Sequence, residues 1–172
     1  GGMHHGFVTG FMHPLTGADH LAAMVAVGLW SALAARRAWP DLLWAPLAFA
    51  GMLLVGALMG LAGVQLPAVE PMIAASLLVL GLLVATRVHL PAVVAMAVVG
   101  VFALFHGVSH GHELASEEGA ALTLAGMVGA TVLLHLAGIA VGWALRHANA
   151  WLPRVAGAAV VVLGASLLAQ AV

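Results

Sequence analysis

Two short histidine-rich stretches hold the side chains best suited to chemistry in this chain of 172 residues. The first, His13-Pro14-Leu15-Thr16-Gly17-Ala18-Asp19-His20, contains two imidazoles and a carboxylate. The second runs from Phe105 to Glu113, where His106, His110 and Glu113 fall on one stripe of a helix with 3.6 residues per turn. Imidazole and carboxylate groups without sulfur suit Ni(II), Co(II), Zn(II) or Cu(II). The two stretches therefore predict a site for a divalent transition-metal ion.

The first stretch lies beside a long apolar run, where an ionisable side chain costs several kcal/mol and usually has a function. Asp19 is one of only six acidic residues in the chain. On an unbroken helix, His13 and His20 would lie roughly 10 Å apart along the axis, too far for one ion. Pro14 disfavours helical backbone at His13, and Gly17 loosens the following turn. We therefore expect the first helix to break near His13-Pro14 and to bring His13 back toward Asp19 and His20.

The composition predicts an integral membrane protein that is all-α. Hydrophobic residues make up 64% of the chain and charged residues only 6%, against about 25% in soluble proteins, and the mean hydropathy is +1.15. Six helices of roughly 20 residues would use nearly the whole chain, so residues 1–172 are predicted to form a single transmembrane domain. Cysteine is absent, which excludes thiolate ligands and disulfides.

The apolar runs predict a bundle of six transmembrane helices, of which the first is the broken one. Their expected ranges are 7–35, 42–64, 72–85, 91–113, 120–145 and 151–169. Glycines four residues apart, at Gly56 and Gly60 and at Gly138 and Gly142, predict closely packed helix pairs. Gly107 and Gly111 form a third pair, which would let a neighbouring helix approach the imidazoles of the second stretch.

The positive charges predict the orientation in the membrane. Acidic residues fall in every second connection, including the loop with Glu117 and Glu118. The connections between these carry the five arginines: Arg36, Arg37, Arg87, Arg146 and Arg154. Because positive charge marks the cytoplasmic side, both termini are predicted to lie outside. At 1.5 Å per residue, His20 and His106 then both lie in the outer half of the bilayer. We therefore expect the first and fourth helices to meet, with His20 and His106 within about 10 Å of each other, around one shared ion.

Other histidines suggest secondary roles. His135 is predicted near the bilayer midplane, where it is either a relay toward the inside or a packing imidazole bonded to a backbone carbonyl. His4 and His5 are candidates to collect metal at the mouth of the site. His112 points away from the stripe that carries His106 and His110.

These residues resemble a known family. The motif His13-Pro14-x-x-Gly17-x-Asp19-His20, followed by Phe105-His106-Gly107-x-x-His110-Gly111-x-Glu113, is similar to that of the HupE/UreJ family of nickel and cobalt permeases. The resemblance implies a bacterial inner-membrane protein that supplies metal to hydrogenase or urease maturation. It implies Ni(II) or Co(II) as transported substrate, no prosthetic group, and the following metal-site residues: His13, Asp19, His20, His106, His110 and Glu113.

The motifs also bear on functions other than that of a permease. No G-x-x-x-x-G-K-[ST] loop occurs, so we expect facilitated or secondary uptake rather than ATP hydrolysis. An enzyme is not expected, because the protease motif H-E-x-x-H is missing and no G-x-S-x-G elbow is expected: Gly107-Val108-Ser109-His110-Gly111 has these letters but lies within the predicted helix 91–113, not at a turn between a strand and a helix. A haem- or metal-binding membrane subunit without transport activity stays the alternative. The expected partners are the metal ion and the lipid bilayer but not nucleic acid, and homo-oligomerisation stays open.

Overall fold

The computed structural model describes residues 2–115 and 119–172, with side chains from residue 5 onward. All regular secondary structure in these residues is helical. The described residues form seven helices: α1 (Gly2–Thr16), α2 (Ala18–Ala34), α3 (Trp44–Leu61), α4 (Val69–Thr86), α5 (Ala92–Leu114), α6 (Ala120–Leu145) and α7 (Trp151–Ala171). The all-α class is confirmed, and α3 to α7 agree with the predicted ranges to within about three residues. The predicted acidic loop with Glu117 and Glu118 lies outside the described residues.

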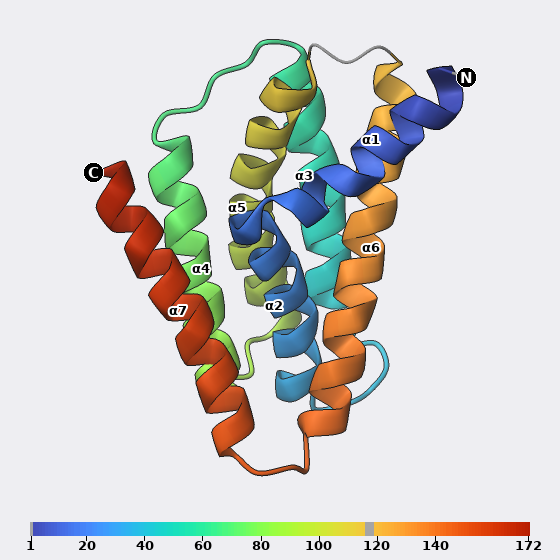
Figure 1. The fold of residues 1–172 in the computed structure, drawn as a ribbon. Coiled ribbons are helices and arrows are strands. Elements are labelled where there is room, and N and C mark those ends of the chain that lie inside the picture. The colour runs from blue at the N-terminus through green and yellow to red at the C-terminus, as the bar shows by residue number, and fades with distance from the viewer. Residues whose placement is uncertain (1, 116–118) are drawn as a thin grey trace.

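Five helices, α3 to α7, are long and apolar enough to cross a membrane. Helices α1 and α2 pass the same test only together, as a pair bent by 83° at the break between them. Several apolar helices of this length indicate a multi-pass membrane protein. In Figure 1, α1 crosses the bundle obliquely and α2 continues along its length.

The predicted position of the break needs a correction. Helix α1 continues through His13 and Pro14 to Thr16, and the chain leaves helical geometry at Gly17, with φ −105° and ψ 115°. Pro14 removes only one backbone donor, which the end of a helix tolerates, and Gly17, itself a poor helix former, follows within the next turn. The Thr16 hydroxyl donates to the carbonyl of His13 at 2.8 Å, so one carbonyl freed by the break is satisfied. The break therefore lies between His13 and His20, as the chemistry requires.

Glycines set the spacing of the helices that carry the site. A Cβ at Gly107 would run into the Leu53 carbonyl and lie 2.9 Å from the Cα of Gly56, and a Cβ at Gly111 would meet Gly60 in the same way. The backbones of α3 and α5 are therefore in direct contact. The neighbouring helix predicted to approach Gly107 and Gly111 is α3, because Gly56 and Gly60 supply the matching small surface.

A second glycine contact joins α2 to α6. Gly28 faces the backbone carbonyl of His135, and Gly138 faces the backbone of α2 from Val25 to Leu29. The predicted close-packing role of Gly138 and Gly142 is confirmed, since Gly142 also contacts Leu29. Side chains on the interior face of α2 are therefore held against α6.

The arginine-bearing connections lie together at one end of the bundle, as predicted from their alternation, and the α3–α4 connection lies at the other (Figure 1). The Arg87 side chain donates to the carbonyl of Arg146 at 3.0 Å, and Arg146 donates to the carbonyl of Ala32 at 2.8 Å. These bonds tie the ends of α2, α4 and α6 together.

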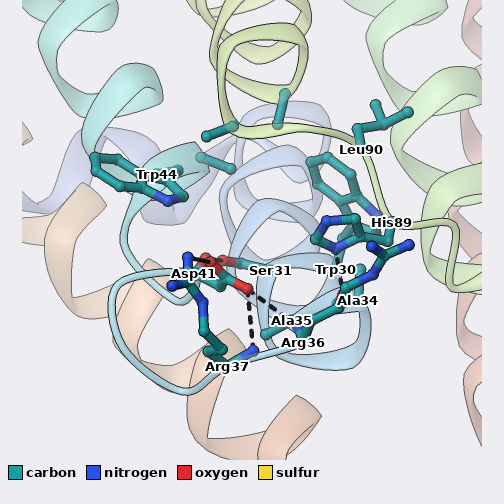
Figure 2. A pocket seen from close by; sticks show the side chains of 13 residues that line it. Trp30, Ser31, Ala34, Ala35, Arg36, Arg37, Asp41, Trp44, His89 and Leu90 are labelled. Atoms are coloured by element: carbon teal, nitrogen blue, oxygen red, sulfur yellow. Dashed lines mark hydrogen bonds and ion pairs between the residues drawn. The ribbon is translucent and has the colours of Figure 1, made fainter.

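A pocket of about 370 Å³ opens at this arginine end, between the 35–43 connection and the start of α5 (Figure 2). Asp41 accepts hydrogen bonds from the backbone N–H groups of Arg36 and Arg37, at 3.1 and 3.0 Å. The Arg37 backbone N–H is the main cause that lowers the pKa of the Asp41 carboxyl below its ordinary value. His89 donates to the carbonyl of Ala34 at 2.9 Å. These polar side chains of the pocket therefore hydrogen-bond to backbone groups at the end of α2 and in the connection that follows it.

Candidate metal centre

The two histidine-rich stretches come together around the break between α1 and α2. His13 lies in the last turn of α1, Asp19 and His20 lie in the first turn of α2, and the second stretch forms the C-terminal half of α5. The break turns His13 and His20 toward the same region, which a straight helix could not do. The spacing of four residues puts His106 and His110 on the buried face of α5.

His13 and Glu113 meet across the outer part of the site. The His13 Nε2–H group donates to the carboxylate oxygen Oε2 of Glu113 at 2.5 Å, although the residues are 100 positions apart. The side chains are 23% and 50% exposed, so both can be reached from the surface. An ion that bound here would replace the shared proton.

His110 is the most unusual side chain of the site. It is fully buried, and neither ring nitrogen has a hydrogen-bond partner among the described residues. Its ring centroid lies 3.9 Å from that of His20 and 4.9 Å from that of His13. Buried polar groups are almost always paired, so two unpaired nitrogens in one ring indicate a missing partner.

One ligand atom from each of His13, His110 and Glu113 can be chosen so that all three lie within 4.8 Å of one another. Two ligands on opposite sides of one ion lie about 4 Å apart, since metal–nitrogen bonds are about 2 Å. Small side-chain movements would therefore let these three residues share an ion.

His20 and His106 confirm the predicted meeting of the two stretches. Their Nδ1 atoms lie 2.7 Å apart, far inside the predicted limit of about 10 Å. The other ring nitrogen of His106, Nε2, lies 2.8 Å from the hydroxyl of Ser76 on α4. Both nitrogens of His106 are therefore engaged by protein atoms, unlike those of His110.

Asp19 lies beside His20 at the start of α2. Its Oδ1 accepts a hydrogen bond from the His20 backbone N–H at 2.9 Å and lies 3.9 Å from His20 Nε2. A carboxylate in the first turn also complements the helix dipole. Asp19 is thus placed either to bind an ion directly or to orient His20.

A pocket of about 630 Å³ opens onto this cluster. It is lined by the predicted residues His13, Asp19, His20 and Glu113, and also by residues that the sequence analysis did not assign to the site: Thr16, Gly17, Glu70, Ile73, Ser109, Leu167, Gln170 and Ala171. Glu70 falls in the connection between the predicted helices 42–64 and 72–85, whereas the structure places it in the first turn of α4. Its acidic type beside an otherwise apolar run was the available signal.

The remaining predicted histidines lie elsewhere. His135 is buried on α6, where its Nδ1–H donates to the carbonyl of Met24 at 2.8 Å and its Nε2 has no partner among the described residues. His112 points away from the site, as predicted, and donates to the carbonyl of Val64 at 2.7 Å. His5 is exposed on α1, and the side chain of His4 lies outside the described residues.

Comparison with known proteins places the chain in a family. The family model described as HupE / UreJ protein matches residues 1–167. The chain belongs to the HupE/UreJ family. It is 44% identical over 171 residues to "Protein HupE" of Rhizobium leguminosarum bv. viciae, covering 97% of this chain and 87% of that protein. No solved structure matches the chain. The resemblance seen in the two motifs thus extends to nearly the whole HupE/UreJ chain.

Proposed function

We propose that this HupE/UreJ protein is a permease that takes up nickel or cobalt across the bacterial inner membrane for hydrogenase or urease maturation. The observation that carries the proposal is His110, a buried imidazole with two unpaired nitrogens next to the His13–Glu113 pair. Imidazole and carboxylate ligands suit these ions, and the chain has no cysteine to favour a softer metal.

The arrangement of charges supports the direction of transport. With the arginine end cytoplasmic, the pocket beside His13 and Glu113 faces the periplasm, and both termini lie on that side. The pair α1 and α2 then makes one broken crossing, the first of six in a single transmembrane domain. Broken helices near a bound ion are a common device of transporters, because the helix ends and the turn between them face the ion.

The interior offers a route from the site toward the midplane. The Phe49 ring lies between two buried imidazoles, with centroid distances of 5.8 Å to His106 and 5.2 Å to His135. In our proposal His135, with its unpaired Nε2, is the next station for the ion, and Phe49 separates that station from the outer site. Uptake in this proposal is facilitated or secondary, because the chain carries no ATP-binding loop.

Uptake by purified protein in lipid vesicles tests this function. Nickel uptake should exceed that of protein-free vesicles, compete with cobalt more than with zinc, and be lost in His110→Gln. The matched control is His112→Gln, two residues away on the same helix, which should transport like the wild type. Nickel binding without uptake would overturn the permease and favour a metal-binding subunit, and a Soret band from the purified protein would favour a haem-binding one.

A further inference from the structure

Ser76 is a buried hydroxyl whose two contacts decide where the protons of the site lie. It is fully buried on α4, as is His106 on α5. Its Oγ lies 2.5 Å from the carbonyl oxygen of Ile73 and 2.8 Å from Nε2 of His106. Ser76 was not assigned to the site by the sequence analysis, although it is the only polar side chain in the predicted helix 72–85.

The hydroxyl has one proton, and its position follows from the Ile73 contact. Two oxygens 2.5 Å apart need a proton between them, and a carbonyl has none, so the Ser76 O–H donates to Ile73. The Ser76 oxygen can then only accept from His106, which places a proton on His106 Nε2.

The proton on His106 Nε2 in turn determines which nitrogen of His20 carries a proton. A neutral imidazole with a proton on Nε2 has a lone pair on Nδ1, so Nδ1 of His106 accepts the 2.7 Å hydrogen bond from Nδ1–H of His20. His20 therefore has its lone pair on Nε2. That atom lies 3.9 Å from Oδ1 of Asp19, and both residues line the pocket.

We propose that Ser76 and His106 are positioning residues that fix the tautomer of His20 and present its Nε2 lone pair to the ion. This inference rests on the proposed function for the identity of the ion. The ligands are then His13, His20, His110 and Glu113, while His106 orients His20 from behind. Metal-binding histidines usually hold their second ring nitrogen in such a bond, and its loss typically lowers metal affinity 10- to 100-fold, as order of magnitude.

The Ser76 hydroxyl matters because the alternative tautomer of His20, with its proton on Nε2, cannot bind a metal ion through that nitrogen. If His20 carried its proton on Nε2, that proton would point toward the Asp19 carboxylate, 3.9 Å away, and the nitrogen could not bind an ion. Without the Ser76 hydroxyl, Nε2–H of His106 loses its acceptor in a fully buried position. The tautomer of His106 with its proton on Nδ1 is then favoured. Nδ1 of His106 would donate to Nδ1 of His20, so His20 would carry its own proton on Nε2.

Nitrogen-15 NMR of histidine-labelled, metal-free protein in detergent tests the proposal, with His20 assigned from its loss in His20→Gln. We expect the Nδ1–H tautomer of His20 in the wild type, the Nε2–H tautomer in Ser76→Ala, and the wild-type tautomer in Ser76→Thr, which keeps the hydroxyl. Nickel affinity, measured by calorimetry, should fall about 10- to 100-fold in Ser76→Ala and be restored in Ser76→Thr.

An Nε2–H tautomer of His20 in the wild type would overturn the proposal, whatever the variants do, so the test does not depend on their folding. An unchanged tautomer in a folded Ser76→Ala protein would overturn it equally. The NMR measurement of the His20 tautomer uses neither metal nor transport. A failure of nickel uptake would therefore count against the proposed function alone.

Discussion

The Nδ1 atoms of His20 and His106 lie 2.7 Å apart, although 86 positions separate the two residues in the chain. This contact joins α2 to α5 through two imidazole side chains. The backbones of these two helices pack closely on other helices. Helix α5 packs on α3 through glycines, and α2 packs on α6 in the same way. The site is thus a meeting of side chains from two helix pairs.

Asp19→Asn should weaken nickel binding by about tenfold or more. The carboxylate contributes negative charge 3.9 Å from His20 Nε2, and the amide keeps the shape and the hydrogen bond to the His20 backbone but loses the charge. Calorimetric titration with nickel measures the effect. Asp41→Asn, the same change at the opposite end of the bundle, is the control and should leave the affinity unchanged.

Nickel uptake should fall when the outside medium is acidified from about pH 7.5 to about pH 5.5. An imidazole must lose its proton to bind a metal, and the ordinary imidazole pKa is about 6.5, so protons compete with the ion across this range. Asp41, at the opposite end of the bundle, does not contribute to the predicted change, because the lowered pKa of its carboxyl keeps it ionised over this range. Initial rates of nickel-63 uptake that stay flat down to pH 5.5 would argue against histidine ligands.

His135→Ala should leave nickel binding at the outer site intact and slow transport. His135 contacts the Met24 carbonyl and the Phe49 ring, and it is not among the residues that line the pocket beside His13 and Glu113. Binding by calorimetry and uptake by vesicles, measured on the same preparation, separate the two effects. Unchanged uptake would reduce His135 to a packing residue.

Gly107→Ala should destabilise the protein by about 1–3 kcal/mol, because the new methyl group collides with the backbone of α3 at Leu53 and Gly56. Gly51→Ala is the matched control, since a Cβ at Gly51 on α3 meets no atom within 4 Å. The control should be neutral or more stable by up to about 1 kcal/mol, as expected for alanine in a helix. Thermal unfolding in detergent compares the two, and equal melting temperatures would contradict the close α3–α5 contact.

Most of the fold could be predicted from the sequence because lipid leaves little choice of structure. Long apolar runs must be helices, and the five from α3 to α7 were placed to within a few residues. Glycines four residues apart correctly marked close contacts, but the pattern does not name the partner. The α5 glycines pack on α3 because Gly56 and Gly60 match them, which is a property of two helices together.

The sequence predicted that the two histidine-rich stretches meet, as they do, but not how the surroundings of their histidines differ. Spacing on α5 brought out His106 and His110 as equals, and only their surroundings distinguish them. His106 is held by Ser76 and His20, whereas both nitrogens of His110 are unpaired among the described residues. The break also fell at Gly17 instead of near His13-Pro14, since local propensities constrain such an end only to within a turn.

X-ray absorption spectroscopy of the nickel-loaded protein tests the central claim most directly, namely that the two stretches share one ion. The account predicts one nickel per chain, bound by nitrogen and oxygen at about 2 Å with imidazole scattering and no sulfur. His110→Gln should lose this spectrum, and His112→Gln should keep it. A nickel spectrum that is the same in wild type and His110→Gln would contradict the shared site.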